Sequence, residues 1–346
     1  MIEIIFKATN LEELEMKTAK PIKIIASGKY LPKIVYSSQI EDLHNLERGW
    51  SAKNSGVESR HHVTFECNGY MGARAVENAF EKSNLQLKDV DLLISASATF
   101  DYPLPNQASV IKSELVNGNE FDFGTIDIDA SCLSFVSAFE VASALLDGKQ
   151  YKTIVIVSSE ISSKGLNPAN KETITLFGDG AVAFILQYDE SADARFYKAM
   201  QKNYTEGIFD SLVKGGGNKY YFKDNPYTAD LYSFTMNGKN LMRLALQKLA
   251  PFIDAFFEDL AIKILDVDSV IPHQASLKAV LILEKTYNFK PNQVKGNLKT
   301  HGNCIASSIP MLLHDSIENG EIKRGDICFL VGTAAGFSIG GALIRY

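Results

Sequence analysis

The chain has 346 residues, of which 46% are hydrophobic and 22% are charged, a balance typical of a soluble globular protein with one large or two fused domains. The 35 basic and 41 acidic residues give a net charge of −6, which argues against a nucleic-acid-binding protein, because neutralising phosphates needs a dominant basic surface. The four cysteines are too few for a disulfide framework and form no C-x-x-C pair. We therefore expect a reducing compartment and a cytoplasmic protein.

The N-terminal half alternates helical and strand-like segments. Residues 70–80 and 133–145 carry apolar residues at helical spacing, whereas residues 91–98, 125–129 and 153–159 form the short apolar or alternating runs of strands. This alternation predicts an α/β fold with buried sheets.

The C-terminal half begins after a predicted loop. Residues 203–229 contain three consecutive glycines and Pro226, so they are expected to join the two halves. Residues 238–260 have apolar residues at helical spacing, although Pro251 should kink or split this helix.

Neither end of the chain predicts export or membrane insertion. Residues 1–7 lack the basic stretch, apolar run and small-residue cleavage site of a signal peptide. Residues 327–344 are uncharged and long enough to raise the question of a membrane helix. The glycines within this segment instead favour two buried strands joined by a glycine loop.

The two halves also resemble each other in sequence. Three pairs of segments match in chain order: 89–94 with 266–271, 106–109 with 273–276, and 125–132 with 293–304. Because the pairs keep nearly one spacing, they predict an internal duplication.

Cys132 is the strongest candidate nucleophile. It follows a predicted strand and precedes an amphipathic helical segment. A thiol in the first turn of a helix lies near the positive end of the helix dipole and near unpaired amides, which favours the thiolate. The alternative is a buried small apolar residue, the commonest role of an intracellular cysteine.

Two further polar residues follow predicted strands. His273 comes directly after the strand 269–272, and Asn303 follows a predicted strand that ends near Lys299. The duplication places both loops around the same pseudo-two-fold axis as Cys132, so we expect the three loops to converge on one site. A lone histidine is otherwise more often a satisfied core residue.

No nucleotide or metal motif accompanies these residues. Residues 215–220 lack the spacing and the Ser or Thr of a phosphate-binding loop, and no G-x-G-x-x-G follows a strand. No pair of histidines has metal-ligand spacing. We expect neither a cofactor nor a metal.

Six sequence blocks occur in order between Pro21 and Tyr346: GVESRH at 56–61, DASC at 129–132, FGDGA at 177–181, PHQAS at 272–276, HGN at 301–303 and GFSIGGAL at 336–343. Together they resemble β-ketoacyl-acyl-carrier-protein synthase III, a condensing enzyme of the thiolase superfamily. The resemblance implies a duplicated βαβαβαββ unit in five layers, α-β-α-β-α. Its implied parts are an N-terminal extension (1–20), an N-terminal half with the nucleophile (21–190) and a C-terminal half with the His and Asn (191–346).

The resemblance implies a decarboxylative Claisen condensation of an acyl-CoA primer with malonyl-acyl-carrier protein, in fatty-acid initiation or a related pathway. Cys132 would take up the acyl group, while backbone N–H groups of Cys132, Ala335 and Gly336 hold the oxyanion. His273 and Asn303 would stabilise the enolate formed as carbon dioxide leaves. The carbanion would then attack the acyl-cysteine and give a 3-oxoacyl-carrier protein.

Other roles are also implied by the resemblance alone. Trp50 would stack on the CoA adenine, Lys171 would lie near the CoA phosphates, and Phe177 would surround the malonyl carboxylate with apolar groups. A homodimer formed through an N-terminal-half strand is implied as well. The basic face that docks the acidic carrier protein would contain Arg243, Lys278 and Lys285.

Three departures from the family pattern bear on the substrate. Leu104 takes the place of an aromatic residue that closes the acyl pocket across the dimer. Ser276 replaces an asparagine that contacts the pantetheine, and Leu133, Ser134 and Phe135 replace small residues. Acetyl-CoA specificity is therefore not expected to carry over, and a longer primer can fit.

Three alternatives remain open. The first is an acyltransferase or a specialised condensing enzyme that makes ketones, alkylresorcinols or quinolones, but transfer alone does not need both His273 and Asn303. A degradative thiolase is disfavoured because Cys328 is not in a C-x-G block. A non-catalytic subunit of a hetero-oligomer would be expected to lack one of the three catalytic residues.

Overall fold

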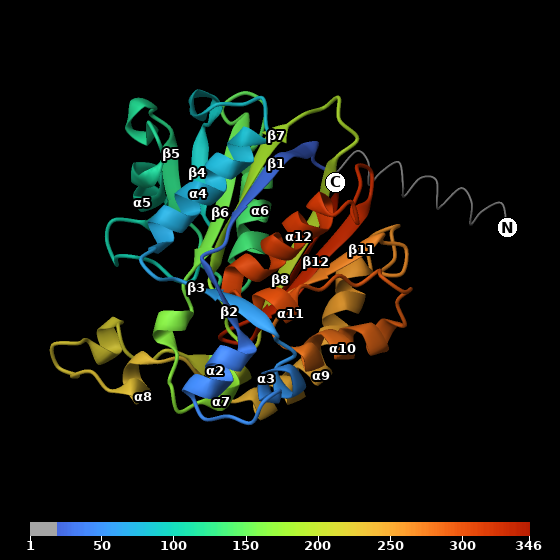
Figure 1. The fold of residues 1–346 in the computed structure, drawn as a ribbon. Helices are drawn as coiled ribbons and strands as arrows, with labels where there is room; N and C mark the ends of the chain where they lie inside the picture. Colours follow the sequence, from blue (N-terminus) through green and yellow to red (C-terminus); the bar gives the residue numbers. More distant parts are fainter. Residues whose placement is uncertain (1–18) are drawn as a thin grey trace.

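Two β-sheets form the centre of the molecule (Figure 1). The computed structural model describes residues 19–346, so most of the predicted extension 1–20 lies outside the described residues. The N-terminal sheet has the order β1-β7-β6-β4-β5, in which β4 is parallel to β5 and β6, and β7 is antiparallel to β1 and β6. Its strands are β1 (Ile22–Tyr30), β4 (Leu92–Ser95), β5 (Gly124–Asp127), β6 (Thr153–Glu160) and β7 (Gly180–Tyr188).

The C-terminal sheet repeats this arrangement. Its order is β11-β12-β13-β8, with β8 (Arg195–Asn203), β11 (Ser269–Pro272), β12 (Ile327–Ala334) and β13 (Ser338–Arg345). An isolated parallel bridge joins Val294 to Val270 beyond β11, where the N-terminal sheet has β5. When the strands of each sheet are numbered in chain order, with the Val294 bridge taken as the third position of the C-terminal sheet, both sheets have the order 1-5-4-2-3. This shared order confirms the predicted duplication.

Helices cover both sheets and separate them (Figure 1). α4 (Asn68–Glu81) and α5 (Gln107–Glu114) pack on the outer face of the N-terminal sheet. α6 (Ser134–Leu145) and α12 (Ser308–Glu318) lie between the sheets. α9 (Gly238–Phe257) and α10 (Leu277–Tyr287) cover the outer face of the C-terminal sheet. The five layers α-β-α-β-α agree with the predicted fold.

The buried strands are apolar on both faces because each sheet is covered on both sides. In β6, Ile154 and Ile156 belong to the central cluster with α6 and α12, whereas Val155 and Val157 belong to the outer cluster with α4. The alternation follows from the two-residue period of a strand.

Shorter elements complete the described chain. They are β2 (Lys33–Tyr36), paired with β3 (Ser59–His62), α2 (Ser37–Leu43), α3 (Trp50–Asn54), α7 (Lys171–Ile174), β9 (Ser211–Leu212), paired with β10 (Thr235–Met236), α8 (Ala229–Tyr232) and α11 (Leu298–His301). Single turns of 3-10 helix lie at Leu87–Asp89, Gly118–Glu120, Ser163–Gly165, Thr205–Gly207, Asn218–Tyr220 and Ile305–Ser307.

Three expectations about the C-terminal half were wrong. The segment 203–229 does not join the two halves, because it follows β8, the first strand of the C-terminal sheet. Of the expected kink or split at Pro251, the split is wrong: α9 runs unbroken past Pro251, and Phe252, Ile253 and Phe256 on the same helix are buried in the outer cluster. The carbonyl that Pro251 leaves without a helical partner belongs to the exposed residue Gln247, so water can reach it.

The segment predicted as a strand before Asn303 makes only the bridge at Val294 and then turns into α11. The amides of Asn297 and Leu298 donate to the side chain of Gln274 instead of to a neighbouring strand. Tertiary hydrogen bonding therefore overrides the local pattern.

The glycine-containing segment near the C-terminus forms β12 and β13, as predicted. Between residues 19 and 346, no helix is both long and apolar enough to span a membrane.

Candidate active site

A cavity of about 450 Å³ opens where strands of both halves end. Cys132 follows β5, His273 follows β11, and Asn303 follows α11; all three line this cavity. Most of the remaining wall is apolar and includes Leu166, from the loop between β6 and α7, and Phe234, from the segment between β8 and α9. The three loops therefore converge on one site, as the duplication predicted.

Cys132 lies in a sharp turn two residues before α6 begins. Ser131 has a φ of 56°, a left-handed conformation that costs energy for a non-glycine residue. The turn is held by the hydroxyl of Ser134, which donates to the Ser131 carbonyl (2.6 Å) and accepts the Ala130 N–H (3.0 Å). These bonds fix the direction in which the thiol points.

The Cys132 thiol is not activated in the free protein, contrary to the expectation from its place before a helix. Burial raises its pKa to about 12, and the nearby Glu160 carboxyl adds to this. The N–H groups of Ala335 and of Cys132 itself act in the opposite direction, but burial outweighs them. The thiol is therefore neutral at neutral pH.

Glu160 is a buried carboxyl at the end of β6 that sequence reasoning missed. It accepts hydrogen bonds from the Ala98 N–H (2.7 Å), the Thr99 N–H (3.0 Å) and the Thr99 hydroxyl (2.6 Å). Ala98 and Thr99 line the cavity, so Glu160 fixes part of its wall. Burial raises the pKa of Glu160 to about 8. The only sequence signal was an acidic residue ending an apolar strand.

His273 is a neutral imidazole at neutral pH, because burial lowers its pKa to about 4. Its Nδ1 is buried and has no hydrogen-bond partner among the described residues. A buried N–H without an acceptor costs more than a buried acceptor without a donor, so the proton belongs on Nε2. His273 therefore offers a donor to the cavity.

Asn303 offers a second donor. Its Oδ1 accepts the Ile305 N–H (2.9 Å), and its amide Nδ2 has no hydrogen-bond partner within residues 19–346, so Nδ2 is available to the cavity. Its backbone forms a parallel bridge with Phe177: its N–H donates to the Leu176 carbonyl (2.9 Å), and its carbonyl accepts the Gly178 N–H (3.1 Å).

This bridge requires glycine on both sides. A Cβ on Gly178 would lie 2.2 Å from the His301 carbonyl oxygen, and one on Gly302 would lie 2.4 Å from the Leu176 carbonyl oxygen. Gly302 also has a φ of 68°, which favours glycine. The glycines of the FGDGA and HGN blocks thus allow the close approach that brings Asn303 beside Phe177.

Known proteins are similar to this chain in fold and in sequence. The family described as 3-Oxoacyl-[acyl-carrier-protein (ACP)] synthase III matches residues 126–204, and the family of its C-terminal region matches residues 257–346. The beta-ketoacyl-[acyl-carrier-protein] synthase III of Clostridium perfringens is 30% identical over 328 residues, which cover 94% of this chain and 99% of that protein. The chain belongs to the 3-oxoacyl-acyl-carrier-protein synthase III family.

Solved structures agree with this assignment. The 3-oxoacyl-[acyl-carrier-protein] synthase III of Aquifex aeolicus VF5 superposes with a TM-score of 0.84 at 25% identity, covering 94% of this chain and 100% of that chain. The priming beta-ketosynthase of the R1128 polyketide pathway (TM-score 0.85, 20% identity, 94% and 97% coverage) and OleA of Xanthomonas campestris (0.81, 19%, 94% and 98%) share the fold.

Three residues assigned from the family resemblance also line the cavity: Ser276, Phe177 and Ala335. Ser276 accepts the Ala279 N–H (3.3 Å) and so caps α10. Phe177 is buried and packs edge-on against Phe234, with 5.3 Å between the ring centroids. Ala335 lies on the same wall, with its N–H directed at Cys132.

Three other predicted residues lie away from the cavity wall. Trp50 is half-buried at the start of α3, Lys171 is exposed at the start of α7, and Leu104 is exposed in the loop after β4. The single chain therefore does not bring Leu104 to the cavity.

The predicted docking residues Arg243, Lys278 and Lys285 are exposed on α9 and α10. The same helices supply Met242 and Ala279 to the cavity wall, so the basic side chains lie beside the site. Within residues 19–346, no three His, Cys, Asp or Glu side chains gather closely enough to hold a metal ion.

Proposed function

We propose that this protein condenses an acyl-CoA primer with malonyl-acyl-carrier protein and releases a 3-oxoacyl-carrier protein and carbon dioxide. The observation that carries the proposal is the convergence of a nucleophile, Cys132, with two neutral donors, His273 and Asn303, in one apolar cavity. Family membership over nearly the whole length of the named relatives supports it.

In the first stage the Cys132 sulfur attacks the primer thioester. A new C–S bond forms to Cys132, the bond to CoA breaks, and the thiol proton ends on the CoA sulfur. The Ala335 and Cys132 N–H groups support the negative oxygen of the intermediate. Gly336, the next residue of the same loop, is assigned there from the family resemblance alone.

In the second stage malonyl-carrier protein enters and loses carbon dioxide. His273 Nε2–H and Asn303 Nδ2–H donate to the thioester carbonyl and stabilise the enolate. The enolate carbon then attacks the acyl-Cys132 carbonyl, and the cysteine leaves as a thiolate that regains a proton. Decarboxylation supplies the carbanion, so the chemistry needs neither a base for carbon nor a cofactor.

Two neutral donors suit this step better than a charged imidazolium, which would hold the malonyl carboxylate by charge attraction and oppose its loss. The lowered pKa of His273 supports this assignment. Phe177, on the same wall, leaves the carboxylate in apolar surroundings.

The remaining family assignments are part of the same proposal. Trp50 and Lys171 would bind CoA outside the cavity, and Ser276 would contact the pantetheine inside it. The carrier protein would dock on α9 and α10 through the exposed residues Arg243, Lys278 and Lys285. A homodimer would bring Leu104 of one copy to the primer end of the other copy's cavity. The four cysteines are free thiols, which suits a reducing cytoplasm.

The proposal is tested by intact-mass measurement after incubation with acyl-CoAs from acetyl to dodecanoyl, followed by malonyl-carrier protein. An acyl adduct should form and then disappear as a 3-oxoacyl product appears. Cys132→Ala should abolish the adduct. Cys67→Ala should not, because Cys67 caps α4 and is absent from the cavity wall.

An adduct that survives in Cys132→Ala would contradict the nucleophile assignment. An adduct that persists with malonyl-carrier protein but transfers to another acceptor would favour an acyltransferase or a specialised condensing enzyme.

A further inference from the structure

The two donors of the cavity are linked by a buried glutamine. Gln274 follows His273 directly and is 1% exposed. Its Oε1 accepts the Asn297 N–H (3.3 Å) and the Leu298 N–H (3.1 Å), and its Nε2 donates to the Pro272 carbonyl (2.9 Å). Gln274 therefore joins the His273 loop to the start of α11.

Helix α11 (Leu298–His301) has only four residues and is followed at once by Gly302 and Asn303. A displacement at the start of so short a helix moves its end, because a single turn has no further length over which to absorb it. The bond from Gln274 thus fixes the position of Asn303 relative to that of His273.

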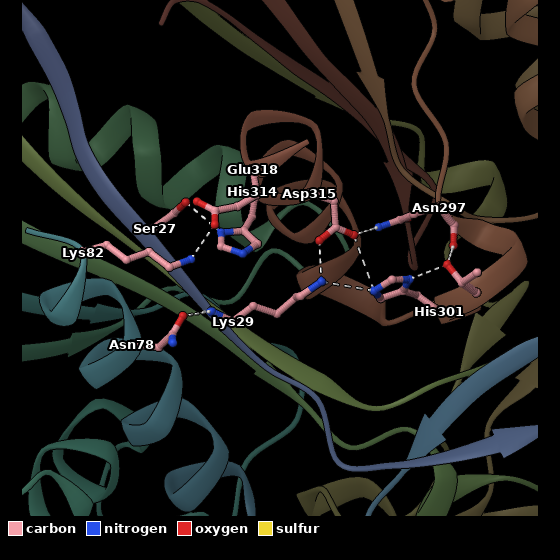
Figure 2. Close-up of polar contacts among 10 residues, drawn as sticks. Ser27, Lys29, Asn78, Lys82, Asn297, His301, His314, Asp315 and Glu318 are labelled. Carbon is pink, nitrogen blue, oxygen red and sulfur yellow. Dashed lines mark hydrogen bonds and ion pairs between the residues drawn. The ribbon is translucent and has the colours of Figure 1, made fainter. Parts of the chain in front are cut away.

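A second anchor, through Asn297 and Asp315, holds the start of the same helix (Figure 2). The Asn297 side-chain Nδ2 donates to Asp315 Oδ2 (2.9 Å), and Asp315 lies on α12 in the central layer. The other Asp315 oxygen forms an ion pair with Lys29 of β1. Asp315 thereby ties α11 to the edge of the N-terminal sheet.

His301 closes the cluster at the far end of α11. Its Nε2 lies 3.4 Å from Asp315 Oδ2 and 3.5 Å from Lys29 Nζ. Its Nδ1 lies 2.8 Å from the Thr300 hydroxyl, whose own proton goes to the Asn297 carbonyl (3.2 Å), so Nδ1–H is the donor. Both ends of the helix are therefore bonded to one cluster.

The charges in the cluster are balanced. Burial alone would raise the pKa of Asp315, but Lys29 and His301 lower it, so the carboxylate stays ionised. Burial lowers the pKa of His301 to about 4, with Asp315 opposing and Lys29 and His61 adding to the shift. At neutral pH the cluster therefore consists of the ion pair between Lys29 and Asp315 and the uncharged side chains of Asn297 and His301.

We propose that Gln274, Asn297 and Asp315 are positioning residues that together hold helix α11 in place; we call these three residues the clamp. The clamp sets the distance between the two hydrogen-bond donors, His273 and Asn303, for decarboxylation. The inference rests on the proposed function, because it assumes that these donors stabilise the enolate. None of the three positioning residues touches the reacting atoms; each acts through α11.

The clamp should affect the two partial reactions unequally. Cys132 acylation does not use the His273 and Asn303 pair, whereas decarboxylation depends on the alignment of both donors. In Gln274→Ala, decarboxylation of malonyl-carrier protein should slow by about 10–100-fold, with primer acylation within about twofold of wild type. The loss should fall on kcat and spare KM for malonyl-carrier protein, because the docking face is untouched.

Gln293→Ala is the matched control. Gln293 is also a buried glutamine of the C-terminal half, accepting the Lys290 N–H (2.9 Å) and donating to the Val267 carbonyl (2.6 Å). It makes no bond to α11, so its loss should leave the ratio of the two partial reactions unchanged.

Asn297→Ala supplies a milder variant in case Gln274→Ala folds poorly. It keeps the backbone N–H that Gln274 accepts and removes only the bond to Asp315, so decarboxylation should fall by several-fold, with acylation again preserved. Because both variants act on one helix, the double variant should lose less than the product of the single losses.

The outcomes are distinct. A wild-type protein that forms the acyl-enzyme and decarboxylates, with an unchanged ratio in both Gln274→Ala and Asn297→Ala, would overturn the clamp alone. Parallel loss of both partial reactions in these variants would also overturn it, since that indicates general destabilisation. A wild-type protein that decarboxylates no malonyl thioester would refute the proposed function, and the inference with it.

Discussion

Glu160 is a buried carboxyl whose charge opposes ionisation of the Cys132 thiol. Its hydrogen bonds all come from Ala98 and Thr99, and no basic side chain pairs with it among the described residues. The Thr99 hydroxyl already accepts the Asn68 Nδ2 (3.2 Å) and the Ile161 N–H (3.1 Å), so its proton points at Glu160. The carboxyl is thus arranged as an acceptor, while burial favours its protonated form.

Glu160→Gln should therefore increase thiol reactivity in a pH-dependent way. Because the pKa of Glu160 is raised to about 8, the wild-type carboxyl becomes charged as the pH rises through that value. Only the charged carboxylate raises the pKa of the Cys132 thiol. Alkylation of Cys132 by iodoacetamide should differ little near pH 6.5 and become up to about tenfold faster in the variant near pH 9.

The exposed Glu258 at the end of α9 provides the control, since Glu258→Gln should follow wild type at every pH. Equal alkylation rates of wild type and Glu160→Gln near pH 9 would show that Glu160 does not influence the nucleophile.

At the scale of elements, the spacing between neighbouring strands places His273. Gly332 of β12 lies beside the end of β11, and a Cβ there would be 2.7 Å from His273 Cβ and 3.2 Å from Ile309 Cδ1. Both neighbours are buried, so neither can move freely into open space. Because Gly332 has no side chain, β12 leaves room for the His273 imidazole.

Gly332→Ala should displace His273 and slow decarboxylation by about 10–100-fold, with a smaller effect on Cys132 acylation. Gly217→Ala is the control, because a Cβ on Gly217 meets no atom within 4 Å. The measurement is the same pair of partial reactions. Unchanged decarboxylation in Gly332→Ala would mean that the strand spacing does not set the imidazole position.

Sequence periodicity predicted the strands and helices whose local pattern of apolar residues is strong. It failed for the segment whose conformation is set by hydrogen bonds to residues distant in the sequence. The apolar runs that became β4, β6, β12 and β13 were recognisable because buried strands have a composition of their own. The expected strand before Asn303 was wrong because Gln274 captures the amides that would have paired. Nothing within residues 293–298 indicates that partner.

At the scale of the whole molecule, the weak repeat predicted the duplication, and the duplication predicted which loops would meet. The sequence could therefore indicate that Cys132, His273 and Asn303 line one cavity. It could not indicate their electrostatics, because burial and the approach of Glu160 to Cys132 exist only after folding. The ion pair of Lys29 with Asp315 joins residues 286 positions apart and has no local signal.

Among residues 19–346, the β5 edge of the N-terminal sheet pairs with no further strand. β5 ends the N-terminal sheet with one side open, and its residue Ile126 is 44% exposed. Phe100, Tyr102 and Leu104 are also exposed, in the loop after β4, which is the strand paired with β5. An open strand edge beside exposed apolar side chains is a site at which a second chain can add.

If two copies pair through β5, each would complete the other's primer pocket with Leu104. Ile126→Lys places a charge on this edge and should convert a dimer into monomers, measured by light scattering after size-exclusion chromatography. Condensation activity should fall together with dimer content, because Leu104 of the single chain does not reach its own cavity. Leu265→Lys, a matched change at an exposed leucine (47%) between α9 and β11, should remain dimeric. An Ile126→Lys variant that stays dimeric would show that the partner surface lies elsewhere. A wild type that is monomeric yet active would show that the primer pocket is closed within one chain.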